Sequence, residues 1–166
     1  MDGNTPLTLS YEKGYLKIFK YLVEYLDINQ KDSQGNSPLI YAIQSGYISI
    51  IKLLIKNGAN VNIKNNKGNS PLIYAIQTDN LAIVKLLTES GSDVHIKNND
   101  GNSPLEYAIN ADNYEITDYL YCYMDMLLKS IVFKKSLIKC NNDLKNTINN
   151  SILRNNNFKN AFPKNI

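Results

Sequence analysis

Apolar and polar residues recur along this chain in blocks that repeat about every 33 positions. In one block, Leu39, Ala42 and Ile43 are spaced i, i+3 and i+4, which places them on one side of a short helix. A second block, 48–55, is apolar nearly all round, as expected for an inner layer between neighbouring units. Polar turns separate these blocks. The pattern therefore predicts stacked units, each made of two short helices.

The repeat is also visible as a recurring five-residue sequence motif. Gly-Asn-Ser-Pro-Leu occurs at 35–39, 68–72 and 101–105, and Gly-Asn-Thr-Pro-Leu occurs at 3–7. A fixed period of this size is typical of a repeat array and not of one core around one active site. Because no unit buries its apolar faces alone, stability should come from stacking.

Local signals mark where the helices begin and end. Ser37 is suited to cap a helix through its hydroxyl, and Pro38 is suited to the first helical position. Gly46 should end that helix with a positive φ. The pairs Asp79-Asn80 and Asp112-Asn113 take its place in the next two units, because Asp and Asn tolerate that conformation.

The unit that begins at Gly35 resembles an ankyrin repeat. It has the turn glycine, the Ser-Pro-Leu helix start, the small Ala42, an aliphatic second helix and the closing segment 58–62. The resemblance covers about 3–124 and implies an all-α solenoid of helix-turn-helix units joined by β-turn or hairpin loops. It predicts four repeats: 3–34, 35–67, 68–100 and 101–124.

Three departures from the ankyrin pattern bear on the fold. The position after the helix-start Leu, which holds His in the family, holds Thr8, Ile40, Ile73 and Glu106, so aliphatic packing should replace a hydrogen-bonding ring in the central repeats. The first repeat is one residue short and has Leu26 where the later repeats have glycine. Its position at one end of the stack predicts that three of its apolar side chains face water or a missing neighbour: Leu7, Leu16 and Phe19.

The C-terminal part loses the repeat. Segment 125–154 has apolar residues at roughly helical spacing, which indicates a capping helix or a degenerate fifth repeat. The Asn-rich segment 155–166 should be disordered. Residues 1–128 hold 10 Lys and Arg against 14 Asp and Glu, whereas 129–166 hold 8 against 1. This basic segment could attract nucleic acid, anionic lipid or the mildly acidic surface of the repeats themselves, or simply stay solvated.

The resemblance implies that a partner protein contacts the concave face and the turn tips of the stack. The expected contacts are the helix residues Tyr41, Gln44, Ser45, Tyr74, Gln77, Thr78, Tyr107 and Asn110, and the turn residues Asn66, Lys67, Asn69, Asn99, Asp100 and Asn102. The three tyrosines are either interface residues or structural rings that pack against the preceding turn. The repeated turn asparagines favour a structural role, because Asn suits turns by itself.

Nothing in the sequence predicts catalysis or a cofactor. There is no phosphate-binding loop, dinucleotide fingerprint or cluster of metal ligands, and the lone His95 has no partner set. Three hypotheses remain: a protein-binding module, an adaptor whose C-terminal helices dock to other machinery such as a ubiquitin ligase, and a nucleic-acid or membrane contact through 129–166. We expect an intracellular protein, cytoplasmic or nuclear, because no secretory signal or membrane span is evident. We also expect a monomer or part of a longer repeat array.

Overall fold

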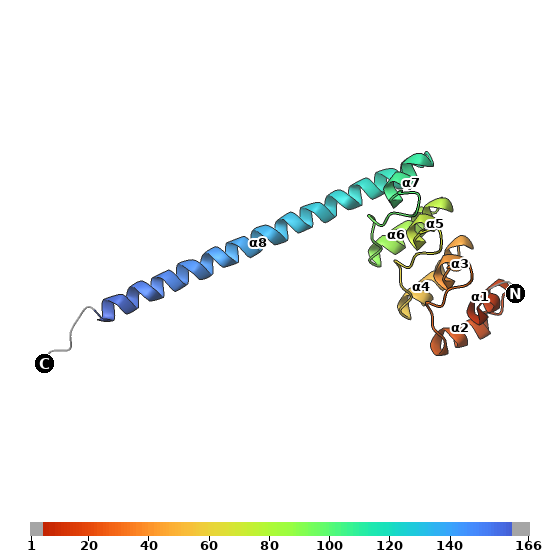
Figure 1. Cartoon of the computed structure of the whole chain (residues 1–166), viewed down its shortest axis with the longest axis horizontal. Coiled ribbons are helices and arrows are strands. Elements are labelled where there is room, and N and C mark those ends of the chain that lie inside the picture. Colours follow the sequence, from red (N-terminus) through yellow and green to blue (C-terminus); the bar gives the residue numbers. More distant parts are fainter. Residues whose placement is uncertain (1–4, 161–166) are drawn as a thin grey trace. The chain divides into compact units, whose positions relative to one another are not determined.

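The computed structural model describes residues 5–160, and these residues form helices joined by turns, with no β-strand among them. The described residues divide into two compact units, 5–122 and 123–160, which are treated separately. Figure 1 shows the elements. They are α1 (Pro6–Glu12), α2 (Leu16–Tyr25), α3 (Pro38–Gln44), α4 (Ile48–Lys56), α5 (Pro71–Gln77), α6 (Leu81–Glu89), α7 (Pro104–Asn110) and α8 (Tyr114–Asn160). The predicted all-α repeat fold is confirmed.

Each repeat contributes a first helix (α1, α3, α5 or α7) and a second helix (α2, α4, α6 or the start of α8). The first helices pack beside one another in chain order, and each of α1, α3 and α5 also packs on its own second helix (Figure 1). Ala42, Ala75 and Ala108 have no exposed surface at these contacts. A small side chain at this position allows the backbones of neighbouring helices to approach closely.

The core runs through the stack as layers of aliphatic side chains. Leu39, Ile43, Ile51 and Leu54 of repeat two are almost completely buried, and repeat three buries the same positions. Burying one such side chain contributes about 1.5–3 kcal/mol. The burial of equivalent aliphatic side chains in successive repeats therefore stabilises the stack.

The hairpin-like turns between repeats share one hydrogen-bond pattern. The N–H of Asp32 donates to the carbonyl of Asn36 at 3.0 Å, and Asn65 and Asn98 donate to Asn69 and Asn102 in the same way. The helix-to-helix turns also follow expectation. The φ angle is 73° at Gly46, 51° at Asp79 and 53° at Asp112, so the prediction that Asp replaces Gly in the left-handed conformation is confirmed.

The prediction that Ser37 caps α3 through its hydroxyl is wrong. The Ser37 hydroxyl is buried without a hydrogen-bond partner, as is that of Ser70. The N–H of Ile40, which Ser37 would cap, donates instead to the Ser37 backbone carbonyl at 3.0 Å. In repeat four, by contrast, the Ser103 hydroxyl accepts from the N–H of Glu106.

The apolar side chains of repeat one are more completely buried than the sequence predicted. Leu7 and Phe19 are buried, so the prediction that they face water is wrong. They occupy positions that the following repeat covers, whereas Ile18 and Tyr21 are exposed. The side chain of Leu16 lies outside the described residues. As anticipated, α2 ends differently from α4 and α6, with Leu26 in an extended conformation.

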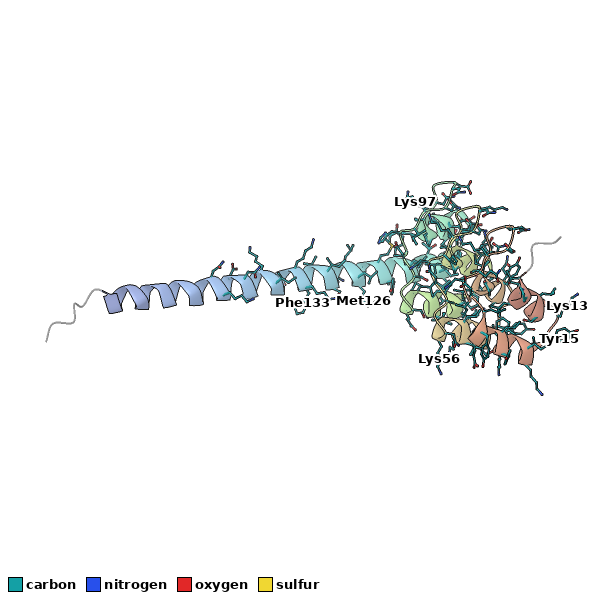
Figure 2. All side chains as sticks on the ribbon, turned by 60° about the horizontal axis from the view of Figure 1, so that its bottom comes forward. Lys13, Tyr15, Lys56, Lys97, Met126 and Phe133 are labelled. Atoms are coloured by element: carbon teal, nitrogen blue, oxygen red, sulfur yellow. The ribbon has the colours of Figure 1, made fainter. Side chains whose placement is uncertain are left out.

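The helix α8 begins in the stack and runs through the second unit. Ile116 and Leu120 are buried in the first unit. Residues 123–160, taken alone, are one helix that exposes several large apolar side chains, among them Met126 and Phe133 (Figure 2). Segment 125–154 thus contains no turn between paired helices, and its capping role stays a prediction. Residues 155–160 continue α8, and 161–166 lie outside the described residues.

Candidate protein-binding surface

The three tyrosines of the first helices lie half-buried, and each hydroxyl has a hydrogen-bond partner. The Tyr41 hydroxyl donates to the Asp32 carboxylate in the preceding turn. The Asn65 amide donates to the Tyr74 hydroxyl at 2.8 Å, again in the preceding turn. The Tyr107 hydroxyl accepts from the Gln77 amide of the previous repeat at 2.8 Å. These contacts give the rings a structural role, and their part in binding stays a prediction.

Burial changes the electrostatics of one of these rings. It raises the pKa of the Tyr74 hydroxyl above its ordinary value, and the hydrogen bonds from Asn69 and Asn65 oppose that rise. Tyr74 therefore stays neutral across the physiological range.

The polar residues beside the tyrosines are more accessible. Gln44, Ser45, Gln77 and Asn110 are exposed, and Thr78 is half-buried. The hydroxyls of Ser45 and Thr78 bond to backbone carbonyls within their own helices. The exposed side chains follow one another along the row of first helices. Gln44 and Asn110 are exposed to solvent, whereas the Gln77 amide donates to the Tyr107 hydroxyl of the next repeat.

The turn residues divide into an exposed set and an inner set. Asn66, Lys67, Asn99 and Asp100 are exposed, as expected for turn tips. Asn69 is buried and Asn102 is half-buried, so Asn69 does not face solvent as a contact residue would. Its Oδ1 accepts instead from the Asn98 amide at 2.9 Å.

Even the exposed turn asparagines have structural contacts. The Asn66 N–H donates to the Gln34 carbonyl at 3.0 Å, and its side-chain amide donates to the Ser33 carbonyl at 3.0 Å. Asn99 makes the same pair of bonds one repeat later. The turns approach so closely that a Cβ atom on Gly35 would lie 2.4 Å from Asn66 Oδ1. These bonds support the structural interpretation of the repeated asparagines.

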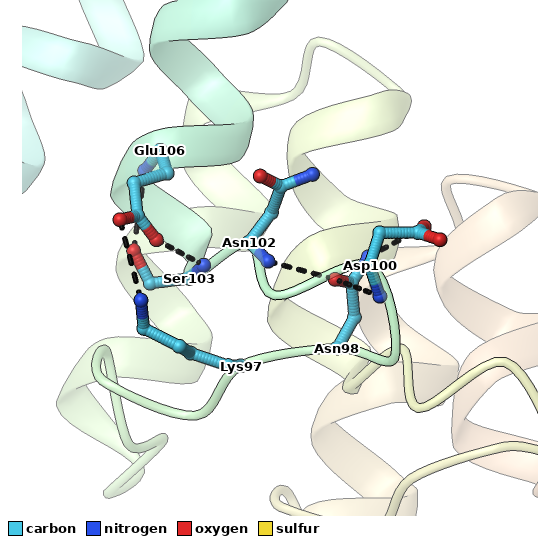
Figure 3. A network of polar contacts seen from close by, with 6 residues as sticks. All are labelled: Lys97, Asn98, Asp100, Asn102, Ser103 and Glu106. Atoms are coloured by element: carbon cyan, nitrogen blue, oxygen red, sulfur yellow. Dashed lines mark hydrogen bonds and ion pairs between the residues drawn. The ribbon is translucent and has the colours of Figure 1, made fainter.

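In the last turn, contacts among Lys97, Ser103 and Glu106 take the place of the lysine-to-carbonyl bonds of the two earlier turns (Figure 3). Lys31 and Lys64 donate to carbonyls of the following turn, but Lys97 pairs with the Glu106 carboxylate at 3.4 Å. Glu106 also accepts from the Ser103 N–H at 2.7 Å. This backbone hydrogen bond is the main cause that lowers the pKa of Glu106.

A cleft of about 560 Å³ lies between repeats three and four. Repeat three supplies its wall from the end of α5, and repeat four supplies the α7-to-α8 turn. Two hydrogen bonds join the walls: Gln77 to Tyr107, and the Asn113 amide to Asp79 Oδ1 at 2.5 Å. The lining residues are Ile76, Gln77, Asp79, Tyr107, Ala111, Asp112, Asn113, Tyr114 and Glu115.

The cleft combines residues that the sequence predicted with others that it did not. Gln77 and Tyr107 were expected to contact a partner, whereas the carboxylates of Asp79, Asp112 and Glu115 were not. Aligning the four repeats does reveal an acidic residue at this turn in the later repeats. The position of Asp79 and Asp112 holds Gly14 and Gly46 in repeats one and two, so only the later repeats carry an acidic side chain at this turn.

Among the described residues, no group of His, Cys, Asp and Glu is arranged to hold a metal ion. Within the same part of the chain, no helix has both the length and the apolar character needed to cross a membrane.

Comparison with known families agrees with the geometry. A family model described as ankyrin repeats (3 copies) matches residues 1–65, and a second, described as ankyrin repeats (many copies), matches residues 54–108. Together they cover the first three repeats and the start of the fourth. No curated protein is significantly similar to this chain.

Proposed function

Because this chain belongs to the ankyrin repeat family, we propose that it is a non-catalytic module that binds another protein across the first helices and turns of repeats two to four. Ankyrin repeats generally bind other proteins, and the family is typically without enzymatic activity. The rigid stack and the row of exposed amide side chains, including Gln44, Gln77 and Asn110, support the same role here.

The cleft between repeats three and four carries the proposal. It is lined by Ile76 and Tyr107 and by three exposed acidic residues, Asp79, Asp112 and Glu115. No Lys or Arg is among the lining residues. A partner side chain with an apolar stem and a positive end fits this combination, because the stem can pack on the ring while the charge meets the carboxylates. We therefore expect the partner to present Lys or Arg here.

The repeats themselves supply a variant that tests the cleft without disturbing the fold. Asp79→Gly and Asp112→Gly restore the residue that repeats one and two use at the same left-handed turn. The double variant removes two carboxylates from the cleft, together with the hydrogen bond from the Asn113 amide to Asp79 Oδ1, and should keep the folded stack because the left-handed turns are preserved. A matched control is Asp93→Asn with Asp118→Asn, which removes two exposed carboxylates outside the cleft.

The experiment is an affinity capture with the full chain, with partners identified by mass spectrometry. We expect a protein that the parent chain and the control variant retain equally and the double glycine variant loses by tenfold or more in affinity. That loss should shrink as salt rises, since exposed charge pairs are screened. Equal retention by all three chains would exclude the cleft as the contact.

A second candidate function is an adaptor, and the exposed apolar side chains of the second unit favour it. Leu128, Val132 and Phe133 are all more than half exposed on α8. Exposed apolar groups of this size commonly mark a protein-binding surface. Deleting residues 129–166 separates the two candidates: a simple binding module keeps all its partners, whereas an adaptor keeps its client and loses the machinery bound through α8.

A further inference from the structure

One face of α8 in the second unit carries apolar and basic side chains together. Residues separated by three, four or seven positions lie on the same side of a helix. From Leu128 onward, this spacing collects four apolar residues and two lysines, and all six side chains are exposed. We call this set the basic face of α8, and its members are Leu128, Ile131, Val132, Lys135, Ile138 and Lys139.

The positive charge of this face is not neutralised within the second unit. Lys129, elsewhere on the helix, pairs with Asp125 at 2.6 Å. Lys135 and Lys139 form no ion pair with any residue that the structure describes. The surrounding segment 129–166 holds eight Lys and Arg against a single Asp. The basic face of α8 therefore suits a partner surface that is acidic and partly apolar.

The acidic residues of the repeat stack gather in its C-terminal half. Residues 79–122 hold eight Asp and Glu against two Lys, whereas residues 5–78 hold four against eight. The cleft between repeats three and four belongs to this acidic half. Three acidic residues and the half-buried Tyr107 are among its lining residues, and no Lys or Arg is. The cleft thus offers the negative charge and the apolar surface that the basic face of α8 lacks and would complement.

A second α8 helix does not complement this face. Pairing two basic faces would bring the lysines of one copy close to those of the other, and like charges repel. Lys135 lies between Ile131 and Ile138 along the face, so these apolar residues cannot pair between copies without covering the lysine as well. Covering an unpaired charge is costly. The charges therefore favour a contact between the helix of one copy and the repeats of another.

We propose that the basic face of α8 docks into the acidic cleft of a second copy of this chain. The stems of Lys135 and Lys139 pack on the Tyr107 ring, and their ammonium groups meet the carboxylates of the cleft. The two surfaces differ, so each copy offers one of each and the contact runs head to tail. The chain then self-associates, whereas the sequence led us to expect a monomer. The inference rests on the proposed function, because it needs the cleft to accept a positive side chain.

Analytical ultracentrifugation of the purified full chain, freed of nucleic acid, tests this contact. At about 50 mM salt the mean mass should rise with protein concentration, and at about 500 mM salt the association should be at least tenfold weaker, because exposed charges are screened. Lys135→Gln with Lys139→Gln should also weaken it at least tenfold. Lys17→Gln with Lys20→Gln is the matched control, since it removes two exposed lysines of α2, and it should leave the association unchanged.

A mixture of two variants identifies the surfaces that meet. The chain with Asp79→Gly and Asp112→Gly keeps its basic face, and the chain with Lys135→Gln and Lys139→Gln keeps its cleft. Neither variant should associate alone, whereas an equal mixture should form a one-to-one complex, which also shows that both variants are folded. Fluorescence-detected sedimentation, with one variant labelled at its N-terminus, measures this complex. A mixture that stays monomeric while the parent chain associates would overturn the proposal.

Other results would also overturn it. A parent chain that stays monomeric at low salt would exclude the contact. Association that becomes tighter in Lys135→Gln with Lys139→Gln would show that two α8 helices pair, since that change removes their repulsion. The capture experiment separates this failure from failure of the proposed function. If capture of another protein still depends on Asp79 and Asp112 while the purified chain is monomeric, only the self-association is wrong.

Discussion

The side-chain amide of Asn65 donates a hydrogen bond of 3.0 Å to Oδ1 of Asn36, and both residues are buried in successive turns of the stack. The same bond joins Asn98 to Asn69 at 2.9 Å. Asn65 also holds its own turn, because its Oδ1 accepts from two backbone N–H groups. One residue type thus fixes both the turn and its distance from the next repeat.

Asn36→Ala tests the bond between turns, because it leaves the turn held by Asn65 intact and otherwise removes only a 3.4 Å contact from the Asn36 amide to Gln34 Oε1. The Asn65 amide keeps its contact with Tyr74, so we expect a loss of about 1 kcal/mol in the free energy of unfolding, measured with urea. Asn110→Ala, at an exposed helix position, serves as the control and should change stability by less than about 0.5 kcal/mol. Equal effects would show that the buried amide contributes nothing specific.

Ser70 and Ser103 occupy equivalent helix starts but should respond differently to substitution. The Ser103 hydroxyl caps α7, so Ser103→Ala should cost about 1 kcal/mol of stability. The buried Ser70 hydroxyl has no hydrogen-bond partner, so Ser70→Ala removes a desolvated polar atom and should be neutral or slightly stabilising. Chemical denaturation of the two variants checks this. A larger loss for Ser70→Ala would contradict the assignment of the cap.

The repeat fold was predictable because its signals are local and recur in register. Each Ser-Pro-Leu segment favours the start of a helix, and each turn glycine permits a positive φ. Both features recur at a fixed spacing, which makes the prediction stronger. The left-handed turn at Asp79 was predictable for the same reason, since Asp replaces Gly at an aligned position. Such features depend on a few adjacent residues and not on what the stack places beside them.

The candidate site was less predictable because it depends on neighbours about 30 residues away. Asn66 and Asn69 stand in the same turn, yet one is exposed and the other is buried by the following turn. The partners of the tyrosine hydroxyls also differ: Tyr74 is bonded to Asn65 in the preceding turn, whereas Tyr107 is bonded to Gln77 on the preceding first helix. The cleft arises only where Asp79 meets Asn113, a contact between repeats that no local pattern encodes.

Ala75 lies at the contact between neighbouring first helices and has no exposed surface. Ala75→Leu should overpack this contact and cost about 1–3 kcal/mol of stability, because the helices cannot separate without losing other contacts. Ala82→Leu is the matched control, since Ala82 is exposed on α6, and it should be nearly neutral. Thermal melts of both variants compare the two positions. If Ala75→Leu is as stable as the control, the close approach of the first helices is wrong.

Glu106 should make the stability of repeat four depend on pH. Hydrogen bonds from Ser103 and the nearby Lys97 lower the pKa of Glu106 in the folded chain from its ordinary value of 4.5. A lowered pKa means that folding favours the ionised carboxylate. The contribution of this carboxylate to stability is therefore complete above about pH 4.5 and is lost as pH falls through the pKa of the folded chain.

Glu106→Gln tests this dependence, because the glutamine keeps an acceptor for the helix start but cannot ionise. The urea midpoint of the parent chain should therefore exceed that of Glu106→Gln at pH 6, and the difference should shrink toward pH 3. A difference that is constant or grows at low pH would show that the carboxylate is not stabilised in this way, and Lys97→Met separates the part of the effect that comes from the ion pair.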